Sequence, residues 1–400
     1  MGDDVSWRIK QARERAGMSR PVLGGLVGRS AEWVKAVETG RLQTPKLHTL
    51  IRLAKALDIA DLAELTGNHD PVQVSRLDGV NTHSALQEVQ TALTTSRFRA
   101  PAGDIDLSHL GERLRSAWTL RHASPDHRTK VGRLLPALIR DAQDAVRAQD
   151  GPQRRQARRL LAGVHLLANF YVAYQPAPEL VWLVVDRAVT EAHEADDPQL
   201  IGGAAWAMVQ VLRESGRWDE ALEVATGALR LLAARPEDDE WNGMRGALLA
   251  ECALTWARKG RLGEALRYWD LADTAARTLG PGYRHVQSSF SVAVLRAHAV
   301  SINVDLRRGG EALRAERRLG GGRIASVPPR ARHLIEIARA HEQQDDRQST
   351  LATLREAHRT APETTRFNGW ARELSAALLE NPPTGEAAAA RELARGLQVS

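Results

Sequence analysis

Basic side chains gather near the beginning of this 400-residue chain. From Arg8 to Lys55 there are eleven lysines and arginines but only three acidic residues, a formal charge of +8. The other 352 residues carry −2, because the net charge is +6. Lysine and arginine neutralise phosphate groups, and the release of counterions makes such binding salt-dependent. A charged run is also typical of a merely solvated surface, so the elements that carry it must decide between the two interpretations.

Sequence patterns for catalysis or metal binding are missing. Gly320-Gly321-Gly322 lacks the Lys-Ser/Thr pair of a phosphate loop, and there is no His-Glu-x-x-His or Gly-x-Ser-x-Gly segment. The thirteen histidines are scattered, and one cysteine can form neither an internal disulfide nor a structural zinc site. We therefore expect no enzyme activity, no cofactor and no metal.

Composition favours a helical protein. Hydrophobic residues make up 43% of the chain and aromatic residues only 4%, so the core is aliphatic and rich in alanine. Of the 55 basic residues 49 are arginine, which suggests a GC-rich bacterial genome. The longest apolar stretch, 160–174, is interrupted by His165 and Asn169 and is shorter than the roughly 20 residues of a membrane span. We expect a cytoplasmic protein, associated with the nucleoid when bound to DNA, without a membrane segment.

Helical periodicity is nearly continuous, in two regimes. Short helices with tight turns occupy residues 5–67, and helices of about 15–22 residues begin near residue 84. Turn-forming residues separate them, in the segments 67–71 and 77–81. The pattern predicts a first domain over 1–67, a linker over 68–83 and an all-α second domain over 84–398.

The first domain contains two short helices joined by a very short turn. Ser19 is placed to cap one helix and Ser30 the next. We expect these helices to end at glycines and to turn apolar residues inward: Leu23, Leu26 and Val27 before Gly28, then Val34 and Val37 before Gly40. Two such helices across a glycine turn form a helix-turn-helix, whose second helix enters a DNA major groove.

The residues of this domain resemble the Cro/C1-type (XRE) helix-turn-helix family. The matching positions are Gly17-Met18-Ser19-Arg20-Pro21-Val22-Leu23-Gly24, Val27-Gly28-Arg29-Ser30, Val34, Val37-Glu38-Thr39-Gly40-Arg41, and Leu50, Leu53, Ala54 and Leu57. Two positions depart from the family, which usually has Gln in place of Arg20 and Ala in place of Gly24. Gly24 and Gly25 each weaken a helix by about 1 kcal/mol, so packing must hold this one.

The resemblance implies roles for individual residues. Phosphate contacts, which position a protein on DNA, are expected from Arg20, Arg29, Thr39, Arg41 and Lys46. Base-edge contacts are expected from the second helix of the motif, at Ser30, Ala31, Glu32, Trp33, Lys35 and Ala36. Trp33 either packs on its own helix or contacts DNA. Glu38 is expected to hold its helix internally, because its charge would repel DNA.

One phrase recurs in the long helical region. A turn followed by Glu-Ala-Leu, or a degenerate form of it, leads to Leu222, Leu266, Leu313 and Leu351, which are 44, 47 and 38 residues apart. The phrase resembles the second helix of a tetratricopeptide repeat, and the spacing makes these repeats longer than the usual 34 residues. Such helix pairs stack into an α-solenoid with a concave binding surface.

Polar side chains within apolar helices indicate what that surface binds. The candidates for effector binding are His165, Asn169, Trp206, Gln210, Arg213, Glu251, Trp256, His298 and Asn303; Asp305 interrupts the same helix as the last two. Buried polar groups must be paired, so a structural role within the solenoid is the alternative for each.

The combination resembles bacterial regulators, including actinobacterial ones, that join these two modules; in some the solenoid captures a peptide. It implies a homodimeric transcriptional regulator that binds a pseudo-palindromic operator in double-stranded DNA. Its solenoid would bind a peptide or small-molecule effector, or a partner. The alternative is a protein-interaction scaffold without specific DNA recognition.

Overall fold

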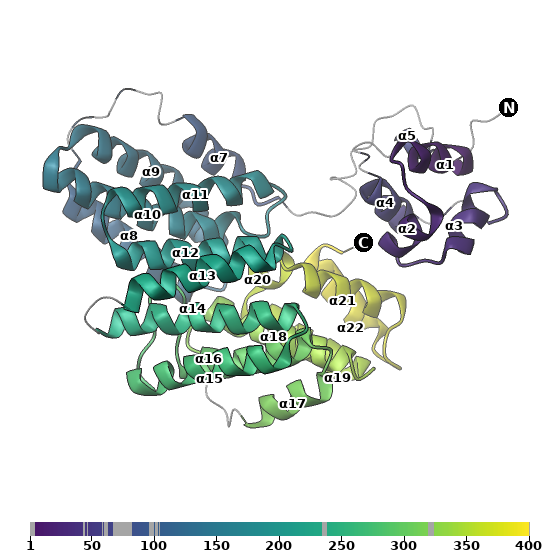
Figure 1. Ribbon diagram of the computed structural model, residues 1–400. Coiled ribbons are helices and arrows are strands. Elements are labelled where there is room, and N and C mark those ends of the chain that lie inside the picture. The colour runs from purple at the N-terminus through teal and green to yellow at the C-terminus, as the bar shows by residue number, and fades with distance from the viewer. Residues whose placement is uncertain are drawn as a thin grey trace. The chain divides into compact units, whose positions relative to one another are not determined.

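The structure, a computed structural model, describes residues 5–42, 45, 47–57, 59, 63–66, 82–95, 100, 103, 105–233, 238–318 and 324–399. Within these ranges every regular element is a helix (Figure 1). The chain forms two compact units, Met1–Val80 and Asn81–Ser400. The predicted linker lies outside the described residues except for Thr82 and His83. No described helix combines the length and the apolar character needed to cross a membrane.

Five helices build the first unit: α1 (Val5–Arg15), α2 (Arg20–Leu26), α3 (Ala31–Glu38), α4 (Leu47–Ala56) and α5 (Ala63–Thr66). They surround an aliphatic core in which Ile9, Leu23 and Leu53 are fully buried. The prediction that Leu26 faces inward is wrong. Its side chain is 57% exposed, because the last turn of α2 turns only Leu23, and then Val27, toward the core.

The second unit is a stack of helices, confirming the predicted α-solenoid. It contains α7 (Leu86–Thr95), α8 (Leu107–Ala123), α9 (His127–Ala148), α10 (Gly151–Val172), α11 (Pro178–Glu194), α12 (Pro198–Glu214), α13 (Trp218–Ala233), α14 (Asp239–Arg258), α15 (Leu262–Leu279), α16 (Val292–Asp305), α17 (Gly309–Arg318), α18 (Val327–Glu342), α19 (Arg347–Thr360), α20 (Pro362–Arg366), α21 (Gly369–Glu380) and α22 (Ala387–Leu397).

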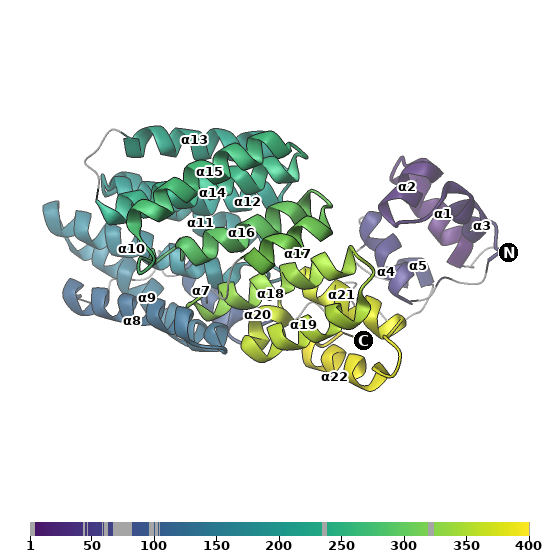
Figure 2. The same cartoon turned by 90° about the horizontal axis from the view of Figure 1, so that it is seen from below.

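Alternate helices form two layers. The helices α10, α12, α14, α16 and α18 each contact the next member of this series, and they form an inner layer. The helices α11, α13, α15 and α17 each pack against two of them, and α19 packs against α18, as an outer layer (Figure 2). The repeated phrase opens α13, α15 and α17 and reaches into α19, so all four copies fall on outer helices. Leu222 and Leu351 are buried there, whereas Leu266 is 45% exposed.

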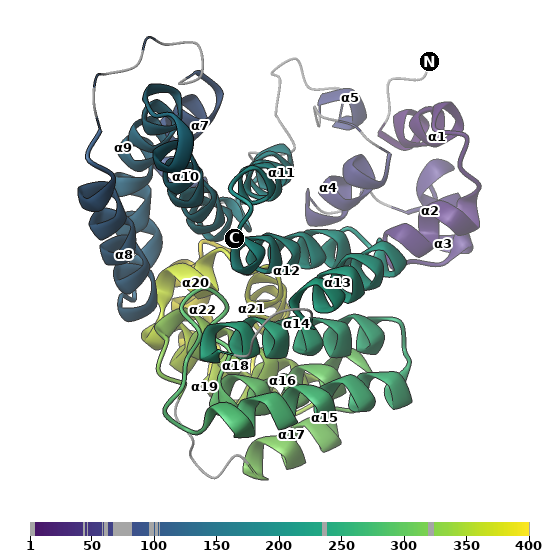
Figure 3. The same ribbon diagram turned by 60° about the vertical axis from the view of Figure 1, so that its left-hand side comes forward.

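The first helices of the solenoid contact segments that lie much later in the chain. On α8, the ring of His122 lies 2.8 Å from the hydroxyl of Ser326, directly before α18, and 2.6 Å from the carbonyl oxygen of Val286. On α20, Glu363 accepts hydrogen bonds from the backbone at the start of α9. Helices α8 and α18 also contact each other, and Figure 3 shows α20 close to α8. The stack is therefore closed, and the inner layer surrounds a central space.

Candidate functional site

The motif helices of the first unit are held by hydroxyl caps. The Ser19 side chain accepts a hydrogen bond from the nitrogen of Val22 at 3.4 Å, at the start of α2. The Ser30 side chain accepts one from the nitrogen of Trp33 at 3.1 Å, at the start of α3. Both predicted caps are confirmed. The glycine of the turn between them, Gly28, has φ +67°, a conformation that other residues rarely adopt.

Gly24 sets the distance between α2 and the turn. A Cβ atom at this position would lie 2.7 Å from the carbonyl oxygen of Arg29 and 3.1 Å from the carbonyl carbon of Ser30. The Gly24 oxygen also accepts a hydrogen bond from the Arg29 nitrogen at 2.8 Å. Close packing of the backbone therefore explains why Gly24 stands where the family that this domain resembles usually has alanine.

A buried carboxylate joins three helices of this unit. Glu38, at the end of α3, accepts hydrogen bonds from Arg13 of α1 and from Nε of Arg20 of α2, the latter at 2.7 Å. Its side chain is completely buried. Burial alone would raise the pKa of Glu38, but the hydrogen bonds from Arg13 and Arg20 bring it below its ordinary value. This placement agrees with the expected internal role of Glu38.

Four of the five predicted phosphate contacts lie among the described residues. Arg29, Thr39 and Arg41 are exposed and flank α3, and the Thr39 hydroxyl donates to the carbonyl oxygen of Lys35 at 2.8 Å. Arg20 is half-exposed, with Nε bound to Glu38. Lys46 lies outside the described residues.

The predicted base-reading residues occupy α3 and its cap. Ser30, Glu32 and Lys35 are exposed, whereas Ala31 and Ala36 are half-buried. Trp33 is also half-buried and packs against the core of the unit, and the Arg29 guanidinium lies 5.6 Å from the centre of its ring. The exposed members present two charged groups of opposite sign, a set able to accept from cytosine and to donate to guanine.

The inner layer of the solenoid lines a cavity of about 550 Å³. Five of the nine predicted effector residues line it, namely Trp206, Gln210, Arg213, Glu251 and His298. They come from α12, α14 and α16, so the structure brings together side chains from three different helix pairs. A cavity of this size is in the range of small-molecule sites.

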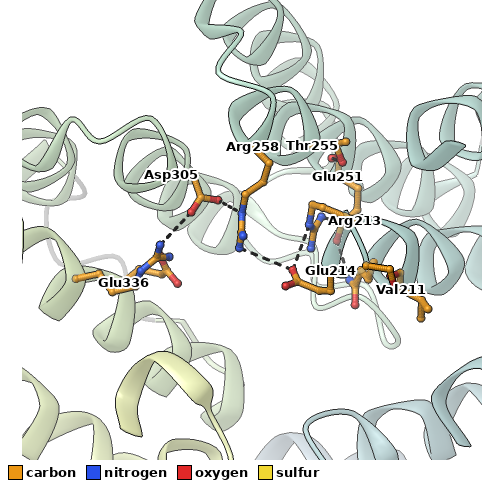
Figure 4. A network of polar contacts seen from close by, with 11 residues as sticks. Val211, Arg213, Glu214, Glu251, Thr255, Arg258, Asp305 and Glu336 are labelled. Atoms are coloured by element: carbon orange, nitrogen blue, oxygen red, sulfur yellow. Dashed lines mark hydrogen bonds and ion pairs between the residues drawn. The ribbon is translucent and has the colours of Figure 1, made fainter. Parts of the chain in front are cut away.

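A chain of ion pairs crosses this cavity (Figure 4). Glu251 accepts from Arg213 and, at 2.7 Å, from the amide of Gln210. Asp305 accepts from Arg258 at 2.6 Å and from Arg339 at 3.2 Å. The two halves are connected through Glu214, which lies 3.5 Å from Arg213 and 3.8 Å from Arg258, and the chain ends where Arg339 donates to Glu336 at 2.7 Å. These pairs neutralise most of the charge in the cavity.

Burial changes the ionisation of groups that line it. Burial raises the pKa of Glu336 to about 6, although Arg339 opposes the shift. Burial lowers the pKa of His298 to about 4, so its ring is neutral near pH 7. Burial would also lower the pKa of Arg213, but Glu251 and Glu214 raise it above its ordinary value.

The remaining four predicted effector residues lie elsewhere. His165 is fully buried within α10, and Trp256 is half-buried with the Lys259 ammonium 5.6 Å from its ring; neither lines this cavity. The amide of Asn303 donates to the carbonyl oxygen of Ala299, one turn back, at 2.8 Å. Asn169 lines a second cavity, of about 370 Å³.

Sequence reasoning missed the charged residues of the second cavity. Arg121, Arg128 and Arg332 line it together with Phe170 and Trp182. It shares Tyr174, Gln210, Glu214, Arg332 and Asn368 with the first cavity, so the two form one continuous groove. No sequence signal distinguishes these arginines from the many others in the chain.

Comparison with known families finds one match. A model described as a helix-turn-helix domain matches residues 4–66, the part of the chain that holds α1 to α5. This match assigns the first unit to a helix-turn-helix domain. A search of curated proteins found no match.

The solved structures that match this chain include PlcR and ComR. PlcR from Bacillus thuringiensis, in complex with the peptide PapR7 and DNA, is 13% identical with a TM-score of 0.32; the alignment covers 88% of this chain and 99% of that one. ComR from S. thermophilus, in complex with DNA and its signalling peptide ComS, is 14% identical with a TM-score of 0.29, covering 89% of this chain and 99% of that one.

Proposed function

We propose that this protein is a sequence-specific DNA-binding transcriptional regulator whose solenoid binds an effector. The observation that carries the proposal is a helix-turn-helix domain in which the second helix keeps Glu32 and Lys35 exposed. We assign DNA binding to residues 1–67 and sensing or assembly to 84–398. We further place the first unit in the Cro/C1 type and describe the helix pairs as lengthened tetratricopeptide-like repeats.

Charge supports the assignment of DNA binding to the first unit. The segment from Arg8 to Lys55 carries +8, and Arg29 and Arg41 are exposed on either side of α3. Among the described residues of this unit, Glu38 is the only acidic residue that is fully buried. Its charge is neutralised within the protein by Arg13 and Arg20. The positive surface therefore remains available for DNA phosphates.

We also propose that the protein acts as a homodimer in the cytoplasm. Helix-turn-helix dimers place two recognition helices about 34 Å apart and read pseudo-palindromic sites. The residues outside the basic segment carry a formal charge of −2, which does not favour binding to DNA. The solenoid is therefore the part available to join two chains. Binding of a peptide or small molecule in its groove would favour one arrangement of the two helix-turn-helix domains in the dimer, because a ligand stabilises the state that it binds better.

Chromatin pull-down with sequencing identifies the best DNA site, and titration of the full-length chain against that site and against random DNA tests the proposal. We expect Arg29→Ala with Arg41→Ala to weaken binding and to reduce the slope of log K against log salt by about 2, since each lost phosphate contact lowers it by ~1. The control, Arg317→Ala with Arg318→Ala, removes the same charge from the exposed end of α17. If the best site binds within a few-fold of random DNA, and the first pair changes nothing, the protein is a scaffold instead.

A further inference from the structure

The second cavity contains buried cationic groups that form no ion pair with a carboxylate among the residues that the structure describes. Arg121 of α8 and Arg128 of α9 are each 4% exposed, and Arg332 of α18 is half-buried beside them. The Nε atoms of Arg121 and Arg128 are buried and have no hydrogen-bond partner among the described residues. No ion pair between these three guanidinium groups and a described carboxylate is found within 4.0 Å.

The contacts that these arginines do make are neutral. Arg121 lies 3.7 Å from the centre of the Phe170 ring, with one terminal nitrogen 3.2 Å from the ring of His122. Arg128 donates to the carbonyl oxygen of Tyr171 at 2.7 Å. Neither contact supplies a negative charge.

The acidic groups nearby are bound elsewhere. Glu363 accepts from the backbone nitrogens of Arg128 and Thr129 and from the Thr129 hydroxyl. Glu214 is the one carboxylate among the described residues that line this cavity, and it lies 3.5 Å from Arg213 and 3.8 Å from Arg258. Three guanidinium groups therefore face a cavity whose single carboxylate is already shared by two other arginines.

Leaving such charges buried without a partner is unfavourable. Burial, followed by the mutual repulsion of these side chains, lowers the pKa of Arg121 well below its ordinary value. Burial lowers the pKa of Arg128 to about 10, although the charge of Glu363 opposes this shift, and Arg128 stays charged at neutral pH. An anionic ligand would supply the missing counter-charge.

The lining indicates the chemical class of that anion. A guanidinium group matches a carboxylate through two parallel hydrogen bonds. Beside the arginines the cavity is lined by Phe170, Val181 and Trp182, which favour an apolar or aromatic body. The groove continues from Arg332 into the first cavity, where polar groups could contact a longer molecule.

We propose that Arg121, Arg128 and Arg332 form a carboxylate-binding subsite for an organic acid with an apolar side group. The acid is either a free small molecule or the C-terminal residue of a peptide. This inference rests on the proposed effector role of the groove and specifies the end at which the ligand is anchored.

Calorimetric titration of the full-length chain tests the subsite. The probes are N-acetyl-phenylalanine, its uncharged amide, 4-phenylbutyrate and inorganic phosphate. We expect N-acetyl-phenylalanine to bind at least tenfold more tightly than its amide, and Arg332→Gln to weaken it at least tenfold. Arg317→Gln, on the exposed end of α17, is the matched control and should change nothing. Equal binding of acid and amide, stronger binding of phosphate, or an unaffected Arg332→Gln variant would overturn the proposal.

A second measurement separates binding from structure. Because Arg121 is a buried charge without a carboxylate partner among the described residues, Arg121→Met should raise the thermal midpoint of the ligand-free protein while it removes binding of N-acetyl-phenylalanine. If Arg121 had only a structural role, the substitution would lower the thermal midpoint. That result would contradict the proposal.

Two further measurements identify the source of the acid and distinguish failure of the subsite proposal from failure of the proposed regulator function. The tetrapeptide Ala-Ala-Ala-Phe, compared with its C-terminal amide, should bind more tightly than 4-phenylbutyrate if the ligand is a peptide, and less tightly if it is a free acid. DNA affinity is measured on the same protein. Acid binding without specific DNA binding refutes only the regulator, whereas specific DNA binding without acid binding refutes only the subsite.

Discussion

The carboxylate of Glu363 accepts a hydrogen bond of 2.6 Å from the backbone nitrogen of Arg128, which is 235 positions away in the sequence. It also accepts from the nitrogen of Thr129 at 3.2 Å, so it caps the first turn of α9. Asp126, the residue directly before this helix, makes no capping hydrogen bond with its side chain. A negative charge from the far end of the chain therefore occupies the helix N-terminus, where it is favoured.

Glu363→Ala should loosen the junction between α9 and α20. Loss of charge-assisted hydrogen bonds to buried donors lowers the free energy of unfolding by about 1–3 kcal/mol. Hydrogen exchange of the Arg128 and Thr129 amides in the full-length chain should accelerate. Glu380→Ala, exposed on α21, is the control and should leave both amides unchanged. Equal exchange in the two variants would show that the cap does not hold the junction.

Glu38→Gln should destabilise the first unit by about 3–5 kcal/mol, because it leaves Arg13 without its buried partner. Chemical unfolding measures the loss, and Glu32→Gln on the exposed side of α3 should have little effect. Since the folded-state pKa of Glu38 is lowered, its contribution is complete above the ordinary glutamate pKa of 4.5. It is lost as the pH falls through the lower folded-state pKa, and a unit whose acid stability is the same with and without Glu38 would contradict this account.

Two adjacent glycines of α2 should respond in opposite directions. A Cβ atom at Gly25 meets nothing within 4 Å, so Gly25→Ala should stabilise the helix by up to about 1 kcal/mol. At Gly24 the same change places a Cβ atom 2.7 Å from the Arg29 carbonyl oxygen, and displacement of the turn should outweigh the gain in helix propensity. Thermal unfolding of the two variants is the measurement. A Gly24→Ala variant with the same thermal midpoint as the unsubstituted protein would mean that the turn shifts without cost to make room for the Cβ atom.

Glu336 should give the solenoid a pH-dependent stability. Its folded-state pKa of about 6 lies above the ordinary value of 4.5, so the folded state binds more protons between these two pH values. The free energy of unfolding should therefore fall as the pH rises from about 4.5 to 6. Urea unfolding across this range measures the slope, which Glu336→Gln should flatten. A slope that is the same in both proteins would assign the titration to another group.

Local signals allowed much of the first unit to be predicted. A serine before each motif helix and a glycine after it are sufficient to place the ends of α2 and α3, because capping depends on neighbouring residues. The same holds for the four outer helices α13, α15, α17 and α19, which are marked by the recurring phrase. Leu26 was predicted wrongly, since helical periodicity over two turns does not distinguish the buried face from its edge.

The groove was predictable only in part. Gln210 and Arg213 are three positions apart on one helix, so they share a face and both reach the cavity. Asn303 has the same kind of polar side chain, but it bonds to its own helix at Ala299 and does not line the groove. Arg121 and Arg128 stand out only because of what surrounds them, and contacts between distant segments cannot be read from composition when 49 residues are arginine.

Closure of the solenoid changes how it should come apart. In an open stack each repeat depends on its two neighbours, so the terminal repeats fray first and short arrays remain folded. Here the hydrogen bonds of His122 and Glu363 join the early helices α8 and α9 to Ser326, directly before α18, and to α20, so unfolding of the early helices must also break these distant contacts. The second unit is therefore expected to unfold cooperatively and not repeat by repeat. Removal of α20 to α22 should also destabilise α8 and α9.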